Sequence, residues 1–383
     1  MNKNLRKYYI WKFFSLNVFI TPIYVIYLRE IGLSYLEIST LHIIRDWTMI
    51  LLEIPSGILS DHIKRKHVLI LSAPCLILGM LLFILYPRFE FIAIGFALWG
   101  AAISLVSGTA EAYAYENVEN KEEYTNVASN SELIRRVSGI FTKATGPILY
   151  SLSQIIPFIG SAVMGVVAFF TSMSLKEDKK KTERKERKYF ENSFNQIKSK
   201  KVILPIVAYA VSLSILSTMF LFQQNLLVDL GVEPIYLSII YGLFFGAGSL
   251  GSYIARHLNK NFSYEYISGA IALTAMISII IMVTSSNIIL VIGTMVCQSL
   301  IHGLLFPTQS IYINQHIENE NRSGLLSFQS LVLSIFRSAM TLVVGIIADL
   351  KGLQAGLLSV CIFSLLLIIG WVIKYTKTKP VAS

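Results

Sequence analysis

The chain has 383 residues, of which 54% are hydrophobic and only 15% are charged. A soluble chain of this length carries charge on about a quarter of its residues, so the composition excludes an ordinary globular protein. The net charge of +10 comes from residues spread over short connectors and not from one amphipathic face, which argues against a nucleic-acid partner.

Long apolar runs dominate the sequence from its beginning. Runs of about 20 residues match the thickness of a bilayer core and predict helices that cross it. The first run follows Lys3, Arg6 and Lys7 without a cleavage site, so we expect a transmembrane helix and not a signal peptide. Six spans are predicted at residues 8–28, 37–59, 68–86, 91–114, 126–151 and 155–175. Six more are predicted at residues 202–226, 235–256, 264–284, 287–313, 323–348 and 353–373.

These spans predict an all-α membrane protein of about 12 transmembrane helices. It has two six-helix halves, residues 1–175 and 202–383, joined by a basic linker at residues 176–201. Lys and Arg concentrate in this linker and in the connectors on the same side of the spans. The connectors of the other side hold only Arg29, Arg88 and Lys351. By the positive-inside rule, we expect both termini in the cytoplasm and the chain in the lipid bilayer of the cell membrane.

The two halves also repeat in sequence. A shift that carries Gly57 onto Gly251 also carries Lys143 onto Arg337. Related halves are typical of secondary transporters, which bind their substrate near the membrane midplane between the repeats.

A charged loop follows the second span and contains Gly57, Asp61, Lys64, Arg65 and Lys66. It resembles the signature loop of the major facilitator superfamily, with Lys64 in place of the second glycine. The preceding Glu-x-Pro-Ser-Gly at residues 53–57 and the stretch SGTAEAYAYE at residues 107–116 are similar to a branch that contains many bacterial efflux proteins. The resemblance implies the fold of that superfamily, transport by alternating access, and a chain that works as a monomer.

This loop is predicted to form a latch on the cytoplasmic side. Gly57 would let neighbouring helices approach closely. Asp61 would face the N-terminus of span eleven near Ser323, where the helix dipole favours an anion. Arg65 and Lys66 would pair with Glu116 below span four. The alternative is that Lys64, Arg65 and Lys66 serve only as topology signals.

Ionised residues inside a span cost about 2.5–3.5 kcal/mol each on insertion scales, so each calls for a reason. The first half holds seven of them: Arg45, Asp46, Glu53, Glu111, Arg135, Arg136 and Lys143. Asp46 and Glu53 share a helix face because they are seven residues apart. The set is either a group of structural ion pairs or a network that binds a proton or a cationic substrate. Glu111 is equally suited to the latch, and Arg45 to a local pair with Asp46.

The second half has Arg337 as its one clear charge within a span. Its spans seven and ten carry neutral polar residues instead: Gln223, Gln224, Asn225, Gln298, His302, Gln309 and Asn314. Such residues suit a cavity for amphipathic ligands, or hydrogen bonds between helices. His302 by itself is better interpreted as a histidine packed between helices than as a ligand or a proton relay.

Span five bears on the direction of transport. Antiporters of the superfamily often carry Gly-Pro-x-x-Gly-Gly there; Gly146 and Pro147 match, but Tyr150 and Ser151 replace the final glycines. The resemblance to the efflux branch favours proton-coupled export of a small organic compound, with proton-linked uptake as the alternative.

An enzyme is the remote alternative. The chain has no GxxxxGK[ST], HExxH or GxSxG motif. Cys75, Cys297 and Cys361 lie in separate apolar runs without pairing or metal-ligand spacing. We therefore expect no catalytic activity, no metal and no cofactor.

Overall fold

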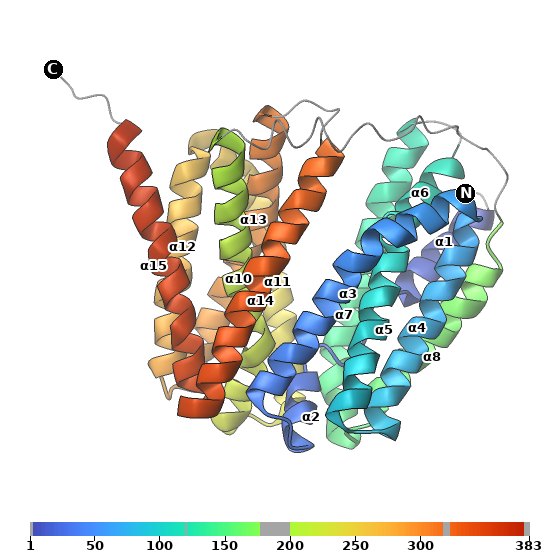
Figure 1. Ribbon diagram of the computed structural model, residues 1–383, viewed down its shortest axis with the longest axis horizontal. Coiled ribbons are helices and arrows are strands. Elements are labelled where there is room, and N and C mark those ends of the chain that lie inside the picture. Colours follow the sequence, from blue (N-terminus) through green and yellow to red (C-terminus); the bar gives the residue numbers. More distant parts are fainter. Residues whose placement is uncertain (1–2, 119–120, 177–199, 317–321, 379–383) are drawn as a thin grey trace. The chain divides into compact units, whose positions relative to one another are not determined.

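The computed structural model describes residues 3–118, 121–176, 200–316 and 322–378, and nearly all of them are α-helical (Figure 1). Helices satisfy their own backbone hydrogen bonds, which is why apolar segments adopt them where no water is available. The predicted basic linker lies almost entirely outside the described residues.

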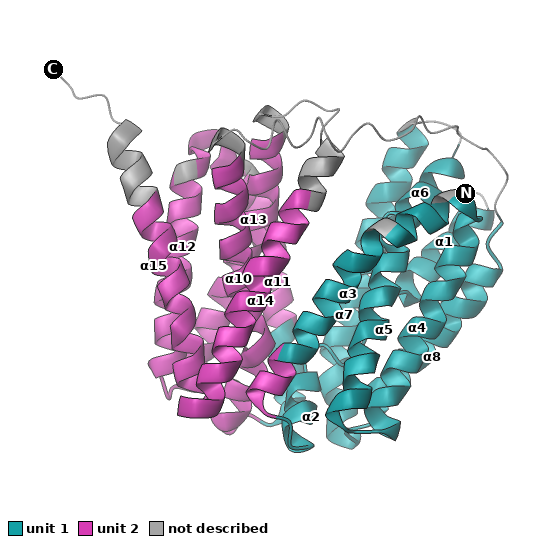
Figure 2. Ribbon diagram, viewed as in Figure 1, with its two compact units in different colours: residues 1–33, 40–184, 233–241 teal, residues 34–39, 185–232, 242–383 magenta. Residues whose placement is uncertain are grey.

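The chain forms two compact units, which are coloured teal and magenta in Figure 2. Unit 1 contains residues 1–33, 40–184 and 233–241, and unit 2 contains residues 34–39, 185–232 and 242–383. The first half of the chain has α1 (Lys3–Phe14), α2 (Tyr24–Glu30), α3 (Tyr35–His62), α4 (Arg65–Leu85), α5 (Phe89–Val106), α6 (Thr109–Glu116), α7 (Lys121–Leu152) and α8 (Ile156–Met173). The second half has α10 (Lys200–Asp229), η1 (Pro234–Tyr236), α11 (Leu237–Asn261), α12 (Tyr264–Thr284), α13 (Ile288–His316), α14 (Arg322–Lys351) and α15 (Leu353–Thr378).

Nine helical stretches among the described residues are long and apolar enough to cross a membrane, with α5 and α6 counted as one stretch. The predicted spans that are not among the nine are the first, the second and the fifth. The helices α3 and α7 have 28 and 32 residues and are long enough, but their charged residues lower their hydropathy. Both helices hold several of the charged residues that were predicted within spans.

The first predicted span, residues 8–28, is not one continuous helix, so that prediction is wrong. The helix α1 ends at Phe14 and α2 begins at Tyr24, with irregular backbone between them. Leu16 in this segment has a φ of 64°, which few residues other than glycine adopt, and Pro22 has no N–H to donate. Hydropathy did not reveal the break because the segment is mostly apolar and carries no charged residue.

The irregular segment packs against α7 and α8, which supply partners for its backbone. The N–H of Phe19 donates to Ser161 Oγ at 3.0 Å, and Ser138 Oγ donates to the carbonyl of Phe13 at 2.5 Å. The carbonyl of Phe19 lies so close to Gly146 that any Cβ there would overlap it. Irregular backbone inside a membrane is tolerated when protein buries it in this way. Gly146 thus has a packing role in this unit.

Small residues also bring α11 and α13 together in unit 2. A Cβ at Gly251 would overlap the carbonyl of Leu300, and a Cβ at Gly303 would overlap that of Gly248. Ser252 Oγ donates to the carbonyl of Gly303 at 3.0 Å. Close approach between small residues is a main source of helix association in membranes, where no hydrophobic effect drives it.

Gly57 differs from its repeat partner Gly251. Within the described part of the chain, no atom lies within 4 Å of a Cβ built at Gly57. The described residues therefore show no close helix approach at Gly57, and its role in helix packing stays a prediction.

The contrast between two glycines can be tested by substitution. Gly146→Ala places a methyl group on the Phe19 carbonyl, and overpacking of this kind costs about 1–3 kcal/mol. We expect a lower melting temperature for the purified protein in detergent. The control Gly57→Ala enters open space and should leave the melting temperature unchanged. Equal effects of the two variants would contradict this account of the broken first span.

Candidate functional site

The loop between α3 and α4 contains the ion pair that the sequence predicts. Arg65 Nη2 lies 2.7 Å from Glu116 Oε1, and the two side chains are only 12% and 17% exposed. Arg65 is the first residue of α4 and Glu116 is the last residue of α6, so the pair joins the ends of two helices. The contact confirms that Arg65 and Glu116 meet.

Lys66 has a different partner from the predicted one. Its Nζ donates to the carbonyl of Leu175 at 3.2 Å, just beyond the end of α8. Asn4 Nδ2 and the hydroxyl of Tyr113 both donate to the next carbonyl, that of Lys176, at 2.8 and 2.6 Å. Together these residues hold the chain where it leaves α8 for the linker. Basic and amide side chains suit this position because the last carbonyls of a helix have no partners within it.

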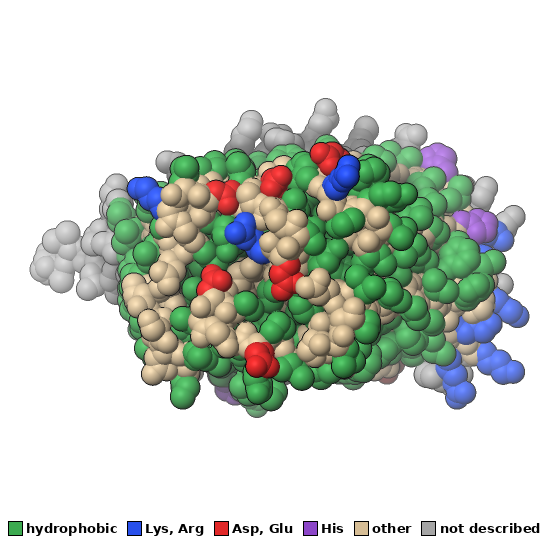
Figure 3. Space-filling view, turned by 90° about the horizontal axis from the view of Figure 1, so that it is seen from below, with side chains coloured by type: hydrophobic (Ala, Val, Ile, Leu, Met, Phe, Trp, Pro, Cys, Tyr) green, Lys and Arg blue, Asp and Glu red, His purple; other side chains and the backbone are tan. Residues whose placement is uncertain are grey.

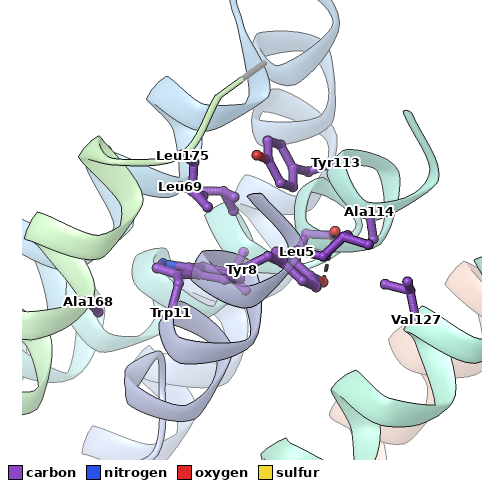
Figure 4. Packing of buried hydrophobic residues seen from close by; sticks show 11 residues of the cluster. Leu5, Tyr8, Trp11, Leu69, Tyr113, Ala114, Val127, Ala168 and Leu175 are labelled. Atoms are coloured by element: carbon purple, nitrogen blue, oxygen red, sulfur yellow. Dashed lines mark hydrogen bonds between the residues drawn. The ribbon is translucent and has the colours of Figure 1, made fainter. Parts of the chain in front are cut away.

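A hydrophobic cluster adjoins these polar contacts through Tyr113, which belongs to both (Figure 4). Tyr8 and Trp11 of α1 are 1% and 0% exposed and stack with a distance of 5.7 Å between ring centroids. Tyr8 also stacks on Tyr113 at 5.7 Å and donates its hydroxyl to the carbonyl of Ala110 at 3.1 Å. Leu69 of α4 and Leu175 complete this packing. The cluster fixes α6, and with it Glu116, relative to α4.

The remaining parts of the predicted latch can be described only in part. Lys64 is exposed and directly precedes α4. The side chain of Asp61 and that of Ser323 lie outside the described residues. A comparable contact is present in unit 2, where the carboxylate of Asp349 accepts the backbone N–H groups of Tyr35 and Leu36, both at 2.8 Å. A carboxylate at the N-terminus of a helix is favoured because it meets unpaired N–H groups and the positive end of the helix dipole.

The charges of α3 form a local pair within the span. Arg45 Nη2 lies 2.9 Å from Asp46 Oδ1, and the Asp46 side chain is 6% exposed. The guanidinium carbon of Arg45 also lies 5.1 Å from the centroid of the Trp99 ring. Helix α5 comes this close because Gly100 packs against the carbonyl of Arg45, which leaves no room for a Cβ. The sequence-based alternative of a local pair for Arg45 is thus observed.

The charges of α7 are paired along their own helix. Glu132 accepts from Arg135 at 2.6 Å and from Arg136 at 2.9 Å. These side chains are 44%, 51% and 53% exposed. Lys143 lies on the same face. A Cβ built at Gly139 would be within 4 Å of both Lys143 Nζ and Asn17 Oδ1, and Asn17 belongs to the irregular segment. Glu132, Arg136, Gly139 and Lys143 follow the spacing of one helix face.

Glu53 and Glu111 are both exposed on their helices. Glu111 lies near Tyr8 of α1 and Tyr124 at the start of α7. Partial burial and this carboxylate raise the pKa of Tyr124. Glu111 therefore faces the side of α6 on which α1 and α7 lie.

The structure adds two residues that sequence reasoning missed. Tyr24 Oη and His42 Nε2 are 2.5 Å apart, and both side chains are buried. His42 precedes Asp46 by four residues, so it lies on the same face of α3. That spacing was available in the sequence and could have identified His42. Its partner could not be found in this way, because Tyr24 belongs to the helix that follows the irregular segment.

The amides of unit 2 separate into two kinds. Gln309 has partners, since it accepts from the hydroxyl of Tyr264 at 2.6 Å. Gln298 Nε2 lies 3.7 Å from Met282 Sδ. Gln223 is fully buried, yet neither of its amide atoms has a hydrogen-bond partner among the described residues. His302 is exposed, and the side chain of Asn314 lies outside the described residues. Arg337 lies partly buried on α14.

A groove of about 470 Å³ between α12 and α13 is lined by residues such as Ile277, Ile281 and Leu290. Its lining contains no ionisable side chain apart from Cys297. It therefore offers no charged group to an ion or to a charged substrate.

Bundles of apolar helices that carry ionised residues inside their spans are typical of multi-pass membrane proteins that move ions or solutes. The chain matches the model of the Major Facilitator Superfamily over residues 12–284 and 218–383, and it belongs to that superfamily. An uncharacterized MFS-type transporter of Bacillus subtilis (strain 168), YxaM, is 24% identical over 370 residues, which cover 92% of this chain and 91% of that protein.

Two solved structures show the same fold. A variant of the nucleoside transporter NupG has a TM-score of 0.81 at 11% identity and covers 97% of this chain and 99% of its own. A bacterial homolog of the human lysosomal transporter Spinster, in an inward-facing and occupied conformation, has a TM-score of 0.78 at 12% identity, with 99% and 98% covered. The chain therefore has the fold of this superfamily, with two six-helix halves.

The ion pair of the loop can be tested by charge reversal. Arg65→Glu or Glu116→Arg alone brings like charges together and should lower the melting temperature of the purified protein. The double reversal should restore it, with a coupling free energy of about 1–3 kcal/mol between the two positions. Lys64→Glu, which changes an exposed neighbour by the same charge, serves as the control. Strictly additive effects of the two reversals would show that the pair does not form.

The two kinds of amide predict opposite effects on stability. Gln309→Met removes a buried group that is hydrogen-bonded and should destabilise the protein by about 1 kcal/mol. Gln223→Met removes a buried amide that has no described partner, so the thermal unfolding of the protein should be unchanged or shifted upward. A loss of stability in Gln223→Met as large as that in Gln309→Met would assign Gln223 to helix packing.

Proposed function

We propose that this transporter couples the movement of protons to the export of a small organic compound. The exposure of ionised side chains inside α7 carries the proposal. An ionised residue that is half exposed in a membrane-spanning helix is not expected to face lipid, because charge at that depth is costly. The face with Glu132, Arg136 and Lys143 is then the face that lines a water-filled path. Glu53 and Glu111, also exposed, supply acids to the same unit.

Asp46 is the acid best suited to coupling. It is buried beside Arg45 and lies 11 residues from the start of α3, about 16 Å along a helix and hence near the middle of a bilayer. An acid that gives up its ion pair with a cation and binds a proton instead can transmit the effect of proton binding to the rest of the helix. Glu53, seven residues further on, extends this face toward the other end of α3.

The direction of transport rests on the resemblance to the efflux branch. Uptake remains the second candidate, because Tyr150 and Ser151 replace the last glycines of the antiporter motif. Tyr150 is buried, and its hydroxyl donates to Glu30 at 2.5 Å, so this position forms a side-chain contact that glycine could not provide.

Charge at the helix ends supports the proposed orientation, with both termini in the cytoplasm. Figure 3 shows acidic side chains spread across one end of the helices. Exposed acids at these helix ends include Glu30, Glu90, Asp229, Glu233 and Asp349. The opposite end of unit 1 carries Lys3, Arg6, Lys64, Arg65 and Lys66 instead. The positive-inside rule assigns that end to the cytoplasm. We further propose that a monomer in the cell membrane is sufficient for transport.

The proposal can be tested in membrane vesicles with two probes of different class. Ethidium represents amphipathic compounds for export, and uridine represents a metabolite for uptake. In everted vesicles, an acidic interior should drive accumulation of ethidium without ATP. Accumulation of uridine in right-side-out vesicles with an acidic exterior would support uptake instead. Transport that requires ATP and ignores the pH gradient would contradict secondary transport in either direction.

The role of the α3 acids predicts an uncoupled phenotype. Asp46→Asn or Glu53→Gln should lower gradient-driven accumulation of the transported probe about tenfold, which is an ordinary size for a coupling effect. Exchange of the probe without a gradient should persist, because the path itself is intact. Glu90→Gln, an exposed acid at a helix end, serves as the control. Full gradient-driven accumulation in both α3 variants would make these acids structural.

A further inference from the structure

His42 and Tyr24 form a buried polar contact that the proposed coupling through Asp46 does not use. His42 is 8% exposed and Tyr24 is 4% exposed. His42 Nε2 and Tyr24 Oη are 2.5 Å apart, and their rings lie 5.3 Å apart at an angle of 34°. A histidine in a bilayer core is uncommon, and in such a position it has to be explained by its partners.

Aromatic residues of α2 and α5 hold the histidine in place. Phe96 of α5 packs against the His42 ring at 5.4 Å, in an edge arrangement. Trp99 of the same helix meets the Tyr24 ring at 6.3 Å and a nearly perpendicular angle. These aromatic contacts exclude water from most of both rings, while the hydrogen bond fixes the Nε2 atom on the hydroxyl.

The ionisable groups around this contact come from the same unit. Arg45 and Asp46 lie on α3, and both act on the Tyr24 hydroxyl. Tyr241, at the start of α11, is the further titratable group near Tyr24. The neighbouring residues of α5, Phe96 and Trp99, carry no titratable group. Among the described residues, one acid, one base and a second phenol therefore lie around the Tyr24 hydroxyl that contacts His42.

We propose that His42, positioned by Tyr24, binds the proton that is coupled to transport and passes its effect to the Arg45–Asp46 pair. The role rests on the proposed proton coupling and extends it to two residues outside the sequence-based set. It also follows from position, because His42 lies seven residues from the start of α3, about 10 Å along the helix. That is nearer than Asp46 to the end from which an exporter takes up protons.

Protonation changes what this contact can do. A neutral imidazole has one N–H and one acceptor nitrogen, so its Nε2 can accept a hydrogen bond from the Tyr24 hydroxyl. The imidazolium has two N–H groups and no acceptor, so Nε2 must donate and Tyr24 must accept. The Tyr24 hydroxyl then turns its own proton away from His42. One proton is gained by the imidazole, and no covalent bond other than the new N–H is made or broken.

The new positive charge also reaches the ion pair. His42 and Asp46 are four residues apart on one helix face, which places their side chains next to each other. An imidazolium there competes with Arg45 for the Asp46 carboxylate. Weakening that pair leaves the Arg45 guanidinium over Trp99, where it can interact with a substrate. The proton on His42 thus alters a second site without a large movement of α3.

Titration of His42 can be observed without any substrate. The chain has six histidines, so the ring signals of protein labelled with ¹³C-histidine in nanodiscs can be assigned by substitution. We expect the signal that is missing in His42→Gln to shift with pH in the wild type, within the range from about pH 5 to 8 in which histidines change charge. A His42 signal that does not change over this range would overturn the proposal, whatever the transport assay shows.

Transport assays then separate this role from a purely structural one. His42→Gln keeps a side chain that can bond to Tyr24 but cannot gain the proton, and His42→Asn is a second variant in case the first does not fold. Gradient-driven accumulation of whichever probe the wild type transports, ethidium or uridine, should fall about tenfold. Exchange without a gradient should be retained. Full gradient-driven accumulation in a folded variant would overturn the proposal.

Tyr24→Phe tests the positioning role. It keeps the ring packed on Phe96 and Trp99 but removes the hydroxyl, so the pH at which transport is half-maximal should move. The matched control is Tyr27→Phe on the same helix, which removes a buried hydroxyl that donates to the carbonyl of Phe83 at 2.7 Å. Tyr27→Phe should leave the pH profile unchanged. Equal pH profiles for Tyr24→Phe and wild type would overturn the role of Tyr24.

The two proposals fail in different ways. If the His42 signal titrates but no pH gradient drives either probe in wild-type vesicles, proton coupling itself is wrong and His42 is a proton site without that role. If a gradient drives transport in wild type and equally in His42→Gln, proton coupling stands and His42 is not its carrier.

Discussion

An ionised side chain in the hydrocarbon core of a bilayer loses its hydration, at a cost of about 2.5–3.5 kcal/mol on insertion scales, unless it meets water or a counter-charge. Unit 1 satisfies this constraint in two ways. Arg45 and Asp46 are buried as a pair beside Trp99, whereas the charges around Arg136 on α7 are half exposed. The first arrangement needs protein around it and the second needs water. Together they indicate which sides of the helices pack against protein and which sides line a water-filled path.

Backbone polarity imposes the same constraint in the broken first span. The segment between α1 and α2 can remain irregular because Ser161 accepts the N–H of Phe19 within it and Gly146 leaves room for the carbonyl of Phe19. Ser138 bonds to the carbonyl of Phe13 at the end of α1. The break also places α2 as a short separate helix, and this helix brings Tyr24 to His42. The geometry of the proposed proton site therefore depends on a glycine that lies on a different helix.

The sequence predicts much of this fold because hydropathy and charge respond directly to the bilayer. The prediction for α12 agrees with the observed helix, and the pairing of Arg65 with Glu116 was predicted from the loop motif. Other features depend on packing that hydropathy does not register. The irregular segment is mostly apolar and uncharged, as a membrane helix would be, and Gly57 has the sequence context of a packing glycine although no described atom lies within 4 Å of a Cβ built there. His42 could have been found from its spacing to Asp46, but its tyrosine partner could not.

The central claim is that the charged face of α7 lines water inside the membrane, and thiol accessibility tests it most directly. Cys75, Cys297 and Cys361 are first replaced by alanine, and single cysteines are then placed at Glu132 or Lys143 on the charged face. The controls are cysteines at Val137 and Phe141, which are 50% and 48% exposed but lie on the opposite, apolar face of the helix. A charged, membrane-impermeant methanethiosulfonate should label Glu132→Cys and Lys143→Cys and spare Val137→Cys and Phe141→Cys. Equal labelling of both faces, or labelling of the apolar face alone, would contradict the account.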